Sequence, residues 1–167
     1  KTDPTGEIRI DQRNAWQSFW NTISFNLFYK SEQTVTLTAA DEASGVAATG
    51  YLLSEEDYSV AQLEGMTFQP YTAPVAITPD SRLIAYARIT DVAGNVTYLR
   101  SDGVVLDATA PVITGVDDGT VYCDSVTFTV TDAYLDTVTV DGAAAVSAPT
   151  RTVESTYVIE ADSQLHT

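Results

Sequence analysis

Residues 35–41 read VTLTAAD and residues 126–132 read VTFTVTD, so one pattern occurs twice in this chain. In both copies apolar or small side chains alternate with threonine, which is the period of a β-strand with one buried and one exposed face. A second pair of similar segments follows in the same order, DSRL at residues 80–83 and DSQL at residues 162–165. Repetition of this kind predicts two copies of one β-rich module.

A proline-bounded segment, DATAP at residues 107–111, separates the two copies and interrupts the strand pattern. A domain boundary within it gives predicted domains at residues 1–109 and 110–167. The first copy continues after DSRL into a further apolar segment, whereas the chain ends at Thr167 soon after DSQL. We therefore expect the second domain to be truncated at its C-terminus and its sheet to have an unpaired edge.

The composition argues against several kinds of partner. The 167 residues include 23 Asp and Glu but only 8 Lys and Arg, which gives a formal charge of −15 that would repel nucleic acid and anionic lipid. No apolar run approaches the roughly 20 residues of a membrane helix, and the first residues do not resemble a signal peptide. We therefore expect neither nucleic-acid binding nor membrane insertion. Cys123 is the single cysteine, so no disulfide can form within the chain.

Alternating segments bounded by turn residues predict the strands. They lie at residues 7–10, 24–29, 34–40, 49–54, 74–78, 83–90 and 95–100, and then at 112–113, 125–131, 137–140 and 152–160. One segment has a different period, because Trp16, Phe19, Trp20 and Ile23 lie at i, i+3, i+4 and i+7. The spacing predicts a short helix over residues 14–22 that closes the end of the first domain and that the second domain lacks.

Three motifs extend this prediction: DEASGV at residues 41–46, TDVAGN at residues 90–95 and LDATAP at residues 106–111. They resemble the signature of bacterial immunoglobulin-like repeats, in which D-x-x-S-G-V is followed by D-x-A-G-N and then by D-x-T-A-P. The resemblance covers most of the first domain and is weaker in the second, where DAYLD at residues 132–136 lacks Ser-Gly-Val.

The resemblance implies an all-β fold of two tandem immunoglobulin-like antiparallel β-sandwiches, the first with the inserted helix and the second truncated. It also implies a non-catalytic extracellular spacer, stalk or adhesion module at the surface or cell wall of a Gram-positive bacterium. The implied partners are neighbouring domains of the same polypeptide and a host or cell-wall glycan or protein.

Residues for catalysis are scarce. His166 is the single histidine, so a nucleophilic triad of the usual kind has no base near the middle of the chain. There is no Cys and His cluster for zinc and no glycine-rich phosphate loop. We predict that the chain is not an enzyme and that it needs no cofactor.

Calcium binding at the linker is a separate hypothesis. Asp102 and Asp107 precede the linker, Asp117 and Asp118 follow it, and calcium prefers several carboxylate and carbonyl oxygens. Aspartate in turns also bonds nearby backbone N–H groups, so solvated turn residues are the alternative interpretation. A lysine to asparagine crosslink would have to use Lys1 or Lys30, the two lysines of the chain.

Carbohydrate binding is the alternative function, as an accessory module of a secreted glycan-active enzyme. Sugar rings stack on exposed aromatic side chains. The available aromatic residues are Trp16, Trp20, Tyr51, Tyr58, Phe68 and Tyr71, most of which we expect in the core. Tyr58, Phe68 and Tyr71 lie in the irregular segment at residues 55–72, and of these six we expect them to be the exposed ones.

Overall fold

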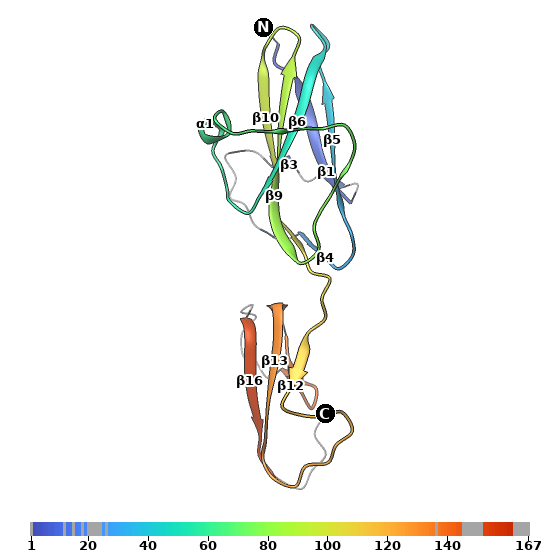
Figure 1. Cartoon of the computed structure of the whole chain (residues 1–167), viewed down its shortest axis with the longest axis vertical. Coiled ribbons are helices and arrows are strands. Elements are labelled where there is room, and N and C mark those ends of the chain that lie inside the picture. The colour runs from blue at the N-terminus through green and yellow to red at the C-terminus, as the bar shows by residue number, and fades with distance from the viewer. Residues whose placement is uncertain are drawn as a thin grey trace. The chain divides into compact units, whose positions relative to one another are not determined.

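The computed structural model describes residues 2–11, 13–14, 16–17, 19, 25, 27–135, 137–144 and 152–161. These residues form mostly β-strands in several sheets, with almost no helix, which confirms the all-β prediction (Figure 1). The chain divides into two compact units, residues 1–108 (unit 1) and 109–167 (unit 2). The predicted boundary lies one residue further along the chain.

Unit 1 contains a small antiparallel sheet with the strand order β2-β1-β5-β8. Its centre is the pair β1 (Thr5–Ile10) and β5 (Thr34–Ala40), which lie side by side along the whole of β1. The strands at its edges are much shorter: β2 (Arg13–Asn14) flanks β1, and β8 (Val75–Ala76) flanks β5.

The second sheet of unit 1 is built around β9 (Ser81–Asp91). One side of β9 pairs with β6 (Val46–Ser54). The other side pairs with β10 (Val96–Ser101) and then with β11 (Val104–Leu106), which follow one another along the same edge. The outermost strands are β7 (Gln69–Pro70) beside β6, β3 (Trp16–Gln17) beside β10, and β4 (Leu27–Tyr29), which is parallel to β11.

The helix predicted over residues 14–22 is wrong where the structure describes this segment. Asn14 belongs to β2 and pairs with Arg9 in the small sheet, whereas Trp16 belongs to β3 and pairs with Ser101 in the second sheet. A helix this short is marginal by itself, and the open edges of two sheets offer the backbone stable partners instead. Trp20 and Ile23 lie outside the described residues.

The helix that does form, α1 (Val60–Leu63), lies in the segment predicted to be irregular. The backbone N–H and the hydroxyl of Ser59 both donate to Oε1 of Gln62, at 3.0 and 2.8 Å, and hold the first turn. Leu63 is fully buried, so this one turn is attached to the body of unit 1 by an apolar contact.

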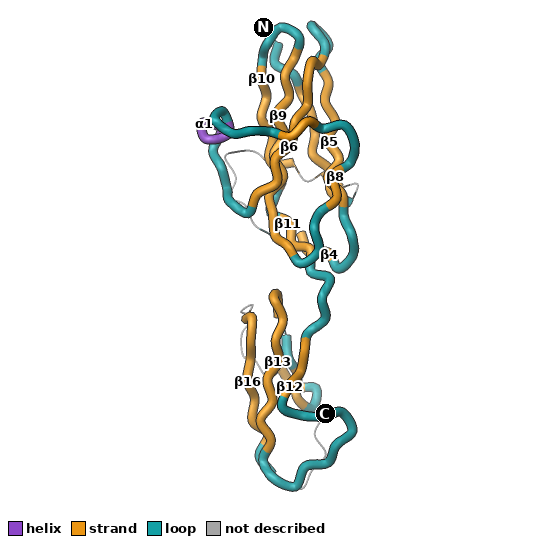
Figure 2. The backbone as a smooth tube through the Cα atoms, in the orientation of Figure 1, coloured by secondary structure: helices purple, strands orange, loops and turns teal. Residues whose placement is uncertain are grey.

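Both faces of β9 are covered. Its odd-numbered residues from Leu83 to Ile89 belong to the main core, together with residues of β1 and β5 such as Ile8 and Val35. Its even-numbered residues Ile84 and Tyr86 point to the outer face, which α1 and the adjoining loops cover (Figure 2). We call these the inner cluster and the outer cluster of unit 1.

Unit 2 contains a three-stranded antiparallel sheet with the order β12-β13-β16. The strands are β12 (Val112–Thr114), β13 (Val126–Leu135) and β16 (Thr152–Ile159). A separate hairpin joins β14 (Thr139–Val140) to β15 (Ala143–Ala144) through the predicted Asp141–Gly142 turn, in which both residues have positive φ. Within the described residues β12 and β16 are edge strands.

The sequence repeat corresponds to a repeat of strand pairing. In unit 1 Thr5 pairs with Ala40, and at the same positions of the motif in unit 2 Val112 pairs with Thr131. The register continues through Glu7, which pairs with Thr38, and the equivalent pair Thr114 and Thr129. In both units a third strand, β8 or β16, pairs with the far edge of the repeated strand.

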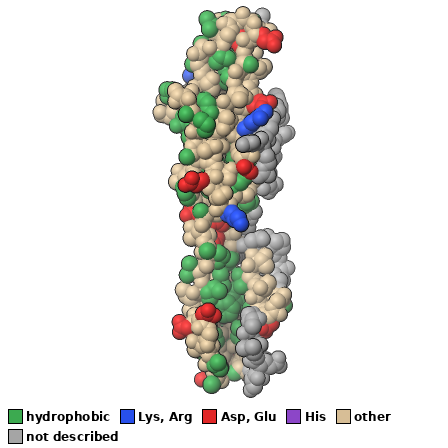
Figure 3. Space-filling model, turned by 90° about the vertical axis from the view of Figure 1, so that its right-hand side faces the viewer, with side chains coloured by type: hydrophobic (Ala, Val, Ile, Leu, Met, Phe, Trp, Pro, Cys, Tyr) green, Lys and Arg blue, Asp and Glu red, His purple; other side chains and the backbone are tan. Residues whose placement is uncertain are grey.

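The buried apolar residues in the described part of unit 2 are Phe128, Val130 and Leu135, fewer than in unit 1. Apolar side chains gather on the face of unit 2 that Figure 3 draws. Among the described residues of this unit, the exposed large apolar ones are Val112, Ile113, Val121, Tyr122 and Val158.

Candidate functional site

The first resemblance motif forms a turn that a single carboxylate closes. Oδ1 of Asp41 accepts hydrogen bonds from the backbone N–H groups of Ala43, Ser44 and Gly45, at 3.1, 2.6 and 2.8 Å. The turn needs a glycine because Gly45 has a φ of +82°. Asp132, at the same position of unit 2, accepts one such bond, from the backbone of Tyr134.

The second motif forms the neighbouring turn and binds the first. Asp91 is 2% exposed, and its two carboxylate oxygens accept from the backbone and the side-chain amide of Asn95, at 2.7 and 2.6 Å. The backbone N–H of Val92 donates to the carbonyl of Gly45 at 3.0 Å. Asp41 and Asp91 therefore each close their own turn, and the backbone bond from Val92 to Gly45 joins the β9–β10 turn to the β5–β6 turn. We call this pair of turns the structural lock.

The pKa values of both carboxyl groups are shifted in the direction that stabilises the charged form. Burial raises the pKa of Asp91, but the side-chain and backbone hydrogen bonds from Asn95 outweigh it and leave the pKa below its usual value. The backbone hydrogen bond from Ser44 is the largest influence on Asp41, and it lowers the pKa of that carboxyl.

Acid should therefore weaken unit 1. The unfolded chain takes up protons on these groups near pH 4, before the folded chain does, so stability present above that pH is lost as the pH falls below it. Calorimetry from about pH 6 to about pH 2 should show this loss, and Asp91→Asn should reduce its slope while lowering the melting temperature at pH 7. Glu42→Gln, in the same turn but exposed, is the matched control. An unchanged acid slope in Asp91→Asn would contradict the assignment.

The three aromatic residues predicted to bind a ligand are half-buried and do not lie together. Tyr58 and Phe68 pack on the outer cluster, whereas Tyr71 packs on the inner cluster. The hydroxyl of Tyr71 accepts a hydrogen bond from the backbone N–H of Leu37 at 3.1 Å, so this side chain supports the edge of β5. They therefore do not form one sugar-stacking surface, and a role for each of them in binding stays a prediction.

The outer cluster holds a polar network beneath its loops. The Tyr86 hydroxyl accepts from the backbone N–H of Tyr58 at 2.8 Å and donates to the carbonyl of Glu56 at 2.9 Å. Nη1 of Arg100 lies 2.5 Å from Oδ1 of Asp57 in the same loop. These contacts fix the loop on the sheet.

Burial raises the pKa of Tyr86 to about 12, above the usual value of 10. A raised pKa stabilises the fold below pH 10, and this contribution is lost as the pH rises through 10 toward 12. We expect the melting temperature of the parent protein to fall over this range. Tyr86→Phe should be less stable at pH 8 by about 1–2 kcal/mol, because two hydrogen bonds are lost, but should show a weaker alkaline decline. An equal alkaline decline in the two proteins would contradict this.

The four aspartates of the calcium hypothesis are divided between the two units. In unit 1 Asp102 is 9% exposed, and its Oδ1 accepts from the backbone N–H of Gly103 at 2.9 Å. Asp107 belongs to the same unit, whereas Asp117 and Asp118 are exposed residues of unit 2. Across the described residues no group of three or more His, Cys, Asp or Glu side chains is placed to hold a metal ion. Calcium at the linker stays a prediction.

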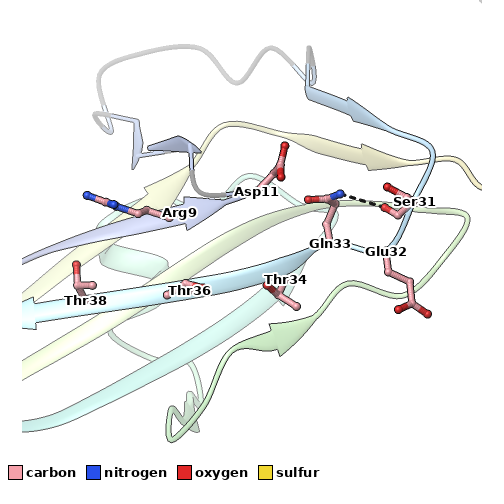
Figure 4. A pocket seen from close by; sticks show the side chains of 8 residues that line it. All are labelled: Arg9, Asp11, Ser31, Glu32, Gln33, Thr34, Thr36 and Thr38. Atoms are coloured by element: carbon pink, nitrogen blue, oxygen red, sulfur yellow. Dashed lines mark hydrogen bonds between the residues drawn. The ribbon is translucent and has the colours of Figure 1, made fainter.

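A shallow, open depression of about 660 Å³ lies on the outer side of the small sheet. Its lining is polar and comes from Arg9, Asp11, Ser31, Glu32, Gln33, Thr34, Thr36 and Thr38. Figure 4 shows the charged groups of Arg9 and Glu32 at opposite ends of it. Arg9 is also paired with Glu7, with Nη2 and Oε2 2.8 Å apart. The depression therefore holds the charged groups of Arg9 and Glu32 apart.

Of the remaining sequence candidates, two lie outside the described residues and two are exposed. His166 lies outside the described residues, as does Lys1. Lys30 and Cys123 are exposed. Sequence reasoning also missed Arg88 and Tyr98, which are neighbours on the outer face of the second sheet. The sequence of β9 could have indicated that this outer face is covered, because its apolar residues fall on both faces, as in a strand that packs on two sides.

No family model, curated protein or solved structure matches the chain. None of the helices in the described residues is long and apolar enough to cross a membrane.

Proposed function

We propose that the chain is a non-catalytic pair of immunoglobulin-like modules that acts as a spacer or adhesion segment of an extracellular bacterial protein. Its partners would be the neighbouring domains of the same polypeptide and a glycan or protein at the cell surface or cell wall. The proposal rests on strand order, on the use of the motif residues and on the path of the chain through unit 1.

Strand order supports the immunoglobulin-like assignment. In unit 1 a sheet of β1, β5 and β8 contributes to one core with a sheet of β6, β9, β10 and β11, and β4 adds a parallel edge strand to β11. Two antiparallel sheets around a common core, joined by connections that pass between them, are the features of that sandwich class. The shared register of β1–β5 and β12–β13 supports a tandem repeat of the plan.

The motif residues support a structural function. Asp41, Asp91 and Asn95 are polar residues of the first two motifs, and each forms hydrogen bonds within the structural lock. A catalytic site would instead leave such groups facing a cavity that substrate can enter.

The path of the chain through unit 1 is the observation that carries the spacer function. The chain enters beside the start of β10, where Thr97 Oγ1 donates to the carbonyl of Pro4 at 2.6 Å and the Asn95 side-chain amide donates to the carbonyl of Thr2 at 3.3 Å. It leaves after the end of β11, where the backbone N–H of Asp107 donates to the carbonyl of Tyr29 (Figure 1). The chain therefore enters and leaves at opposite ends of the long strands. A force applied to the two ends of unit 1 would act along the length of these strands.

Single-molecule stretching from the two ends of the full chain tests this function. Force along the strands must break many backbone hydrogen bonds together, so we expect a distinct rupture of unit 1 that releases about 3.5 Å for each unfolded residue. Asn95→Ala removes bonds of the structural lock and one bond to the first residues, and it should lower the rupture force. Extension of unit 1 without a distinct rupture would contradict the proposal that unit 1 acts as a spacer that resists force.

A further inference from the structure

Arg88 on β9 is a partly buried arginine that has no ion pair among the residues that the structure describes. Its side chain is half-buried, and its Nε atom is fully buried without a hydrogen-bond partner. A buried polar nitrogen normally has a partner, and leaving a charged group without one costs stability. Nε of Arg100 and the hydroxyl of Tyr157 are the other such atoms among the described residues, but the Arg100 side chain also forms an ion pair, and Arg88 therefore calls for a physical explanation.

The other arginines on the same face have partners. Arg100 is 4% exposed, forms the ion pair with Asp57, and has its Cζ atom 5.1 Å from the ring centre of Phe19. Arg82, further along β9, has its Cζ atom 4.3 Å from the ring centre of Phe25. Arg100 and Arg82 thus have an ion pair or lie over a ring, whereas no ion pair and no cation–ring contact of Arg88 is found among the described residues.

Aromatic side chains lie on both sides of Arg88, one on the neighbouring strand β10 and one over the neighbouring strand β6. Tyr98 of β10 is its direct cross-strand partner on one side, and Gly50 of β6 is its partner on the other. Phe68 lies over Gly50, so closely that a Cβ atom there would be 2.9 Å from the Cβ atom of Phe68. The rings of Phe68 and Tyr98 are 5.9 Å apart between centres. The Arg88 side chain therefore lies beside the half-buried rings of Phe68 and Tyr98.

Only side chains can recognise a ligand at this position. The backbone of β9 at Arg88 is paired with β6 on one side and with β10 on the other. An extended peptide gains affinity chiefly from main-chain hydrogen bonds to a free strand edge, which the centre of a sheet does not offer. A sugar that carries a carboxylate needs a cation for its charge and aromatic faces for its ring, and both are present.

We propose that Arg88, flanked by Phe68 and Tyr98, binds the carboxylate of an acidic sugar residue on the outer face of unit 1. The proposal specifies an acidic glycan as the ligand for adhesion, and it therefore rests on the proposed function. The formal charge of −15 opposes the approach of any anion, so binding depends on this local arrangement rather than on overall attraction. The role of Arg88 in binding would explain its presence although its buried Nε lowers the stability of the fold.

Calorimetric titration of the full chain with a short oligogalacturonate tests the site, and the methyl-esterified oligosaccharide is the neutral control ligand. We expect binding of the acid form and affinity at least tenfold weaker for the ester. Arg88→Met keeps the length of the stem and removes the charge, so it should also weaken binding at least tenfold while raising the melting temperature of the free protein. Arg82→Met, on the same strand, is the matched control and should bind as the parent does.

Several outcomes would overturn the proposal. Absence of binding, or binding that Arg88→Met leaves intact, removes Arg88 as the ligand group. Binding of an oligoglutamate peptide as tightly as the oligogalacturonate, with the same dependence on Arg88, removes the assignment to a sugar. Neither result affects the stretching experiment, so failure of this site and failure of the spacer function are distinguishable.

Discussion

Leu63→Ala is expected to lower the free energy of unfolding of unit 1 by about 2–5 kcal/mol. Leu63 is fully buried and is the one buried residue of α1. It packs in the outer cluster with Ile84 and Tyr86, so its removal leaves a cavity between the helical turn and the sheet. The segment that carries Asp57 and Tyr58 would then lose its main apolar attachment.

Urea unfolding followed by tryptophan fluorescence measures this effect, because both tryptophans of the chain, Trp16 and Trp20, belong to unit 1. Glu64→Ala changes the adjacent exposed residue and is the matched control, with an expected effect within about 0.5 kcal/mol. A loss below 1 kcal/mol in Leu63→Ala would mean that α1 does not cover the sheet as described.

Gly6→Ala should have a comparably large effect for the opposite reason, because it adds an atom where there is no space. A Cβ atom at Gly6 would be 2.4 Å from Cδ1 of Ile89 and 2.4 Å from the backbone oxygen of Thr38. The backbone oxygen cannot turn away as a side chain can. We expect unit 1 to lose about 1–3 kcal/mol or more, which is typical of overpacking between two sheets.

Gly65→Ala is the matched control, since the nearest atom to its added Cβ is 3.6 Å away and its φ is not positive. It should be neutral or slightly stabilising. In unit 2 the position equivalent to Gly6 holds Ile113, which is 57% exposed. A large side chain is therefore accommodated at this position of unit 2, whereas at Gly6 there is no space for one. Equal effects of the two alanine substitutions would contradict the close approach of β1 to the second sheet.

The strands were predictable wherever alternation and turn residues agree. The predicted strand at residues 34–40 has the bounds of β5, and the hairpin around residues 91–95 is present as β9 and β10. The Asp141–Gly142 turn is also where it was expected. In each of these cases local preference and burial favour the same structure.

The errors lie where tertiary contacts decide. The aromatic spacing at residues 16–23 fits a helix, but the edges of two sheets take up Asn14 and Trp16 as short strands. The α1 turn was missed although Ser59 and Gln62 have the spacing of a capping box.

The candidate site was the least predictable part. Asp41 and Asp91 were visible in the motifs, but their contact depends on how two separate turns meet. Arg88 has no distinguishing mark in the sequence, since its unpaired Nε follows from the side chains that neighbouring strands place around it. Sequence alternation assigns a residue to a face of a sheet but does not supply the groups beside it on that face.

The repeat of strand pairing is the central claim, and cross-strand proton contacts measured by NMR test it most directly. The structure predicts main-chain contacts between Gly6 and Ala39 in unit 1 and between Ile113 and Val130 at the equivalent place in unit 2. A shift of one residue would turn Ile113 to the opposite face of its sheet. Contacts from Ile113 to Thr129 or Thr131 in place of Val130 would contradict the claim that both units share one plan.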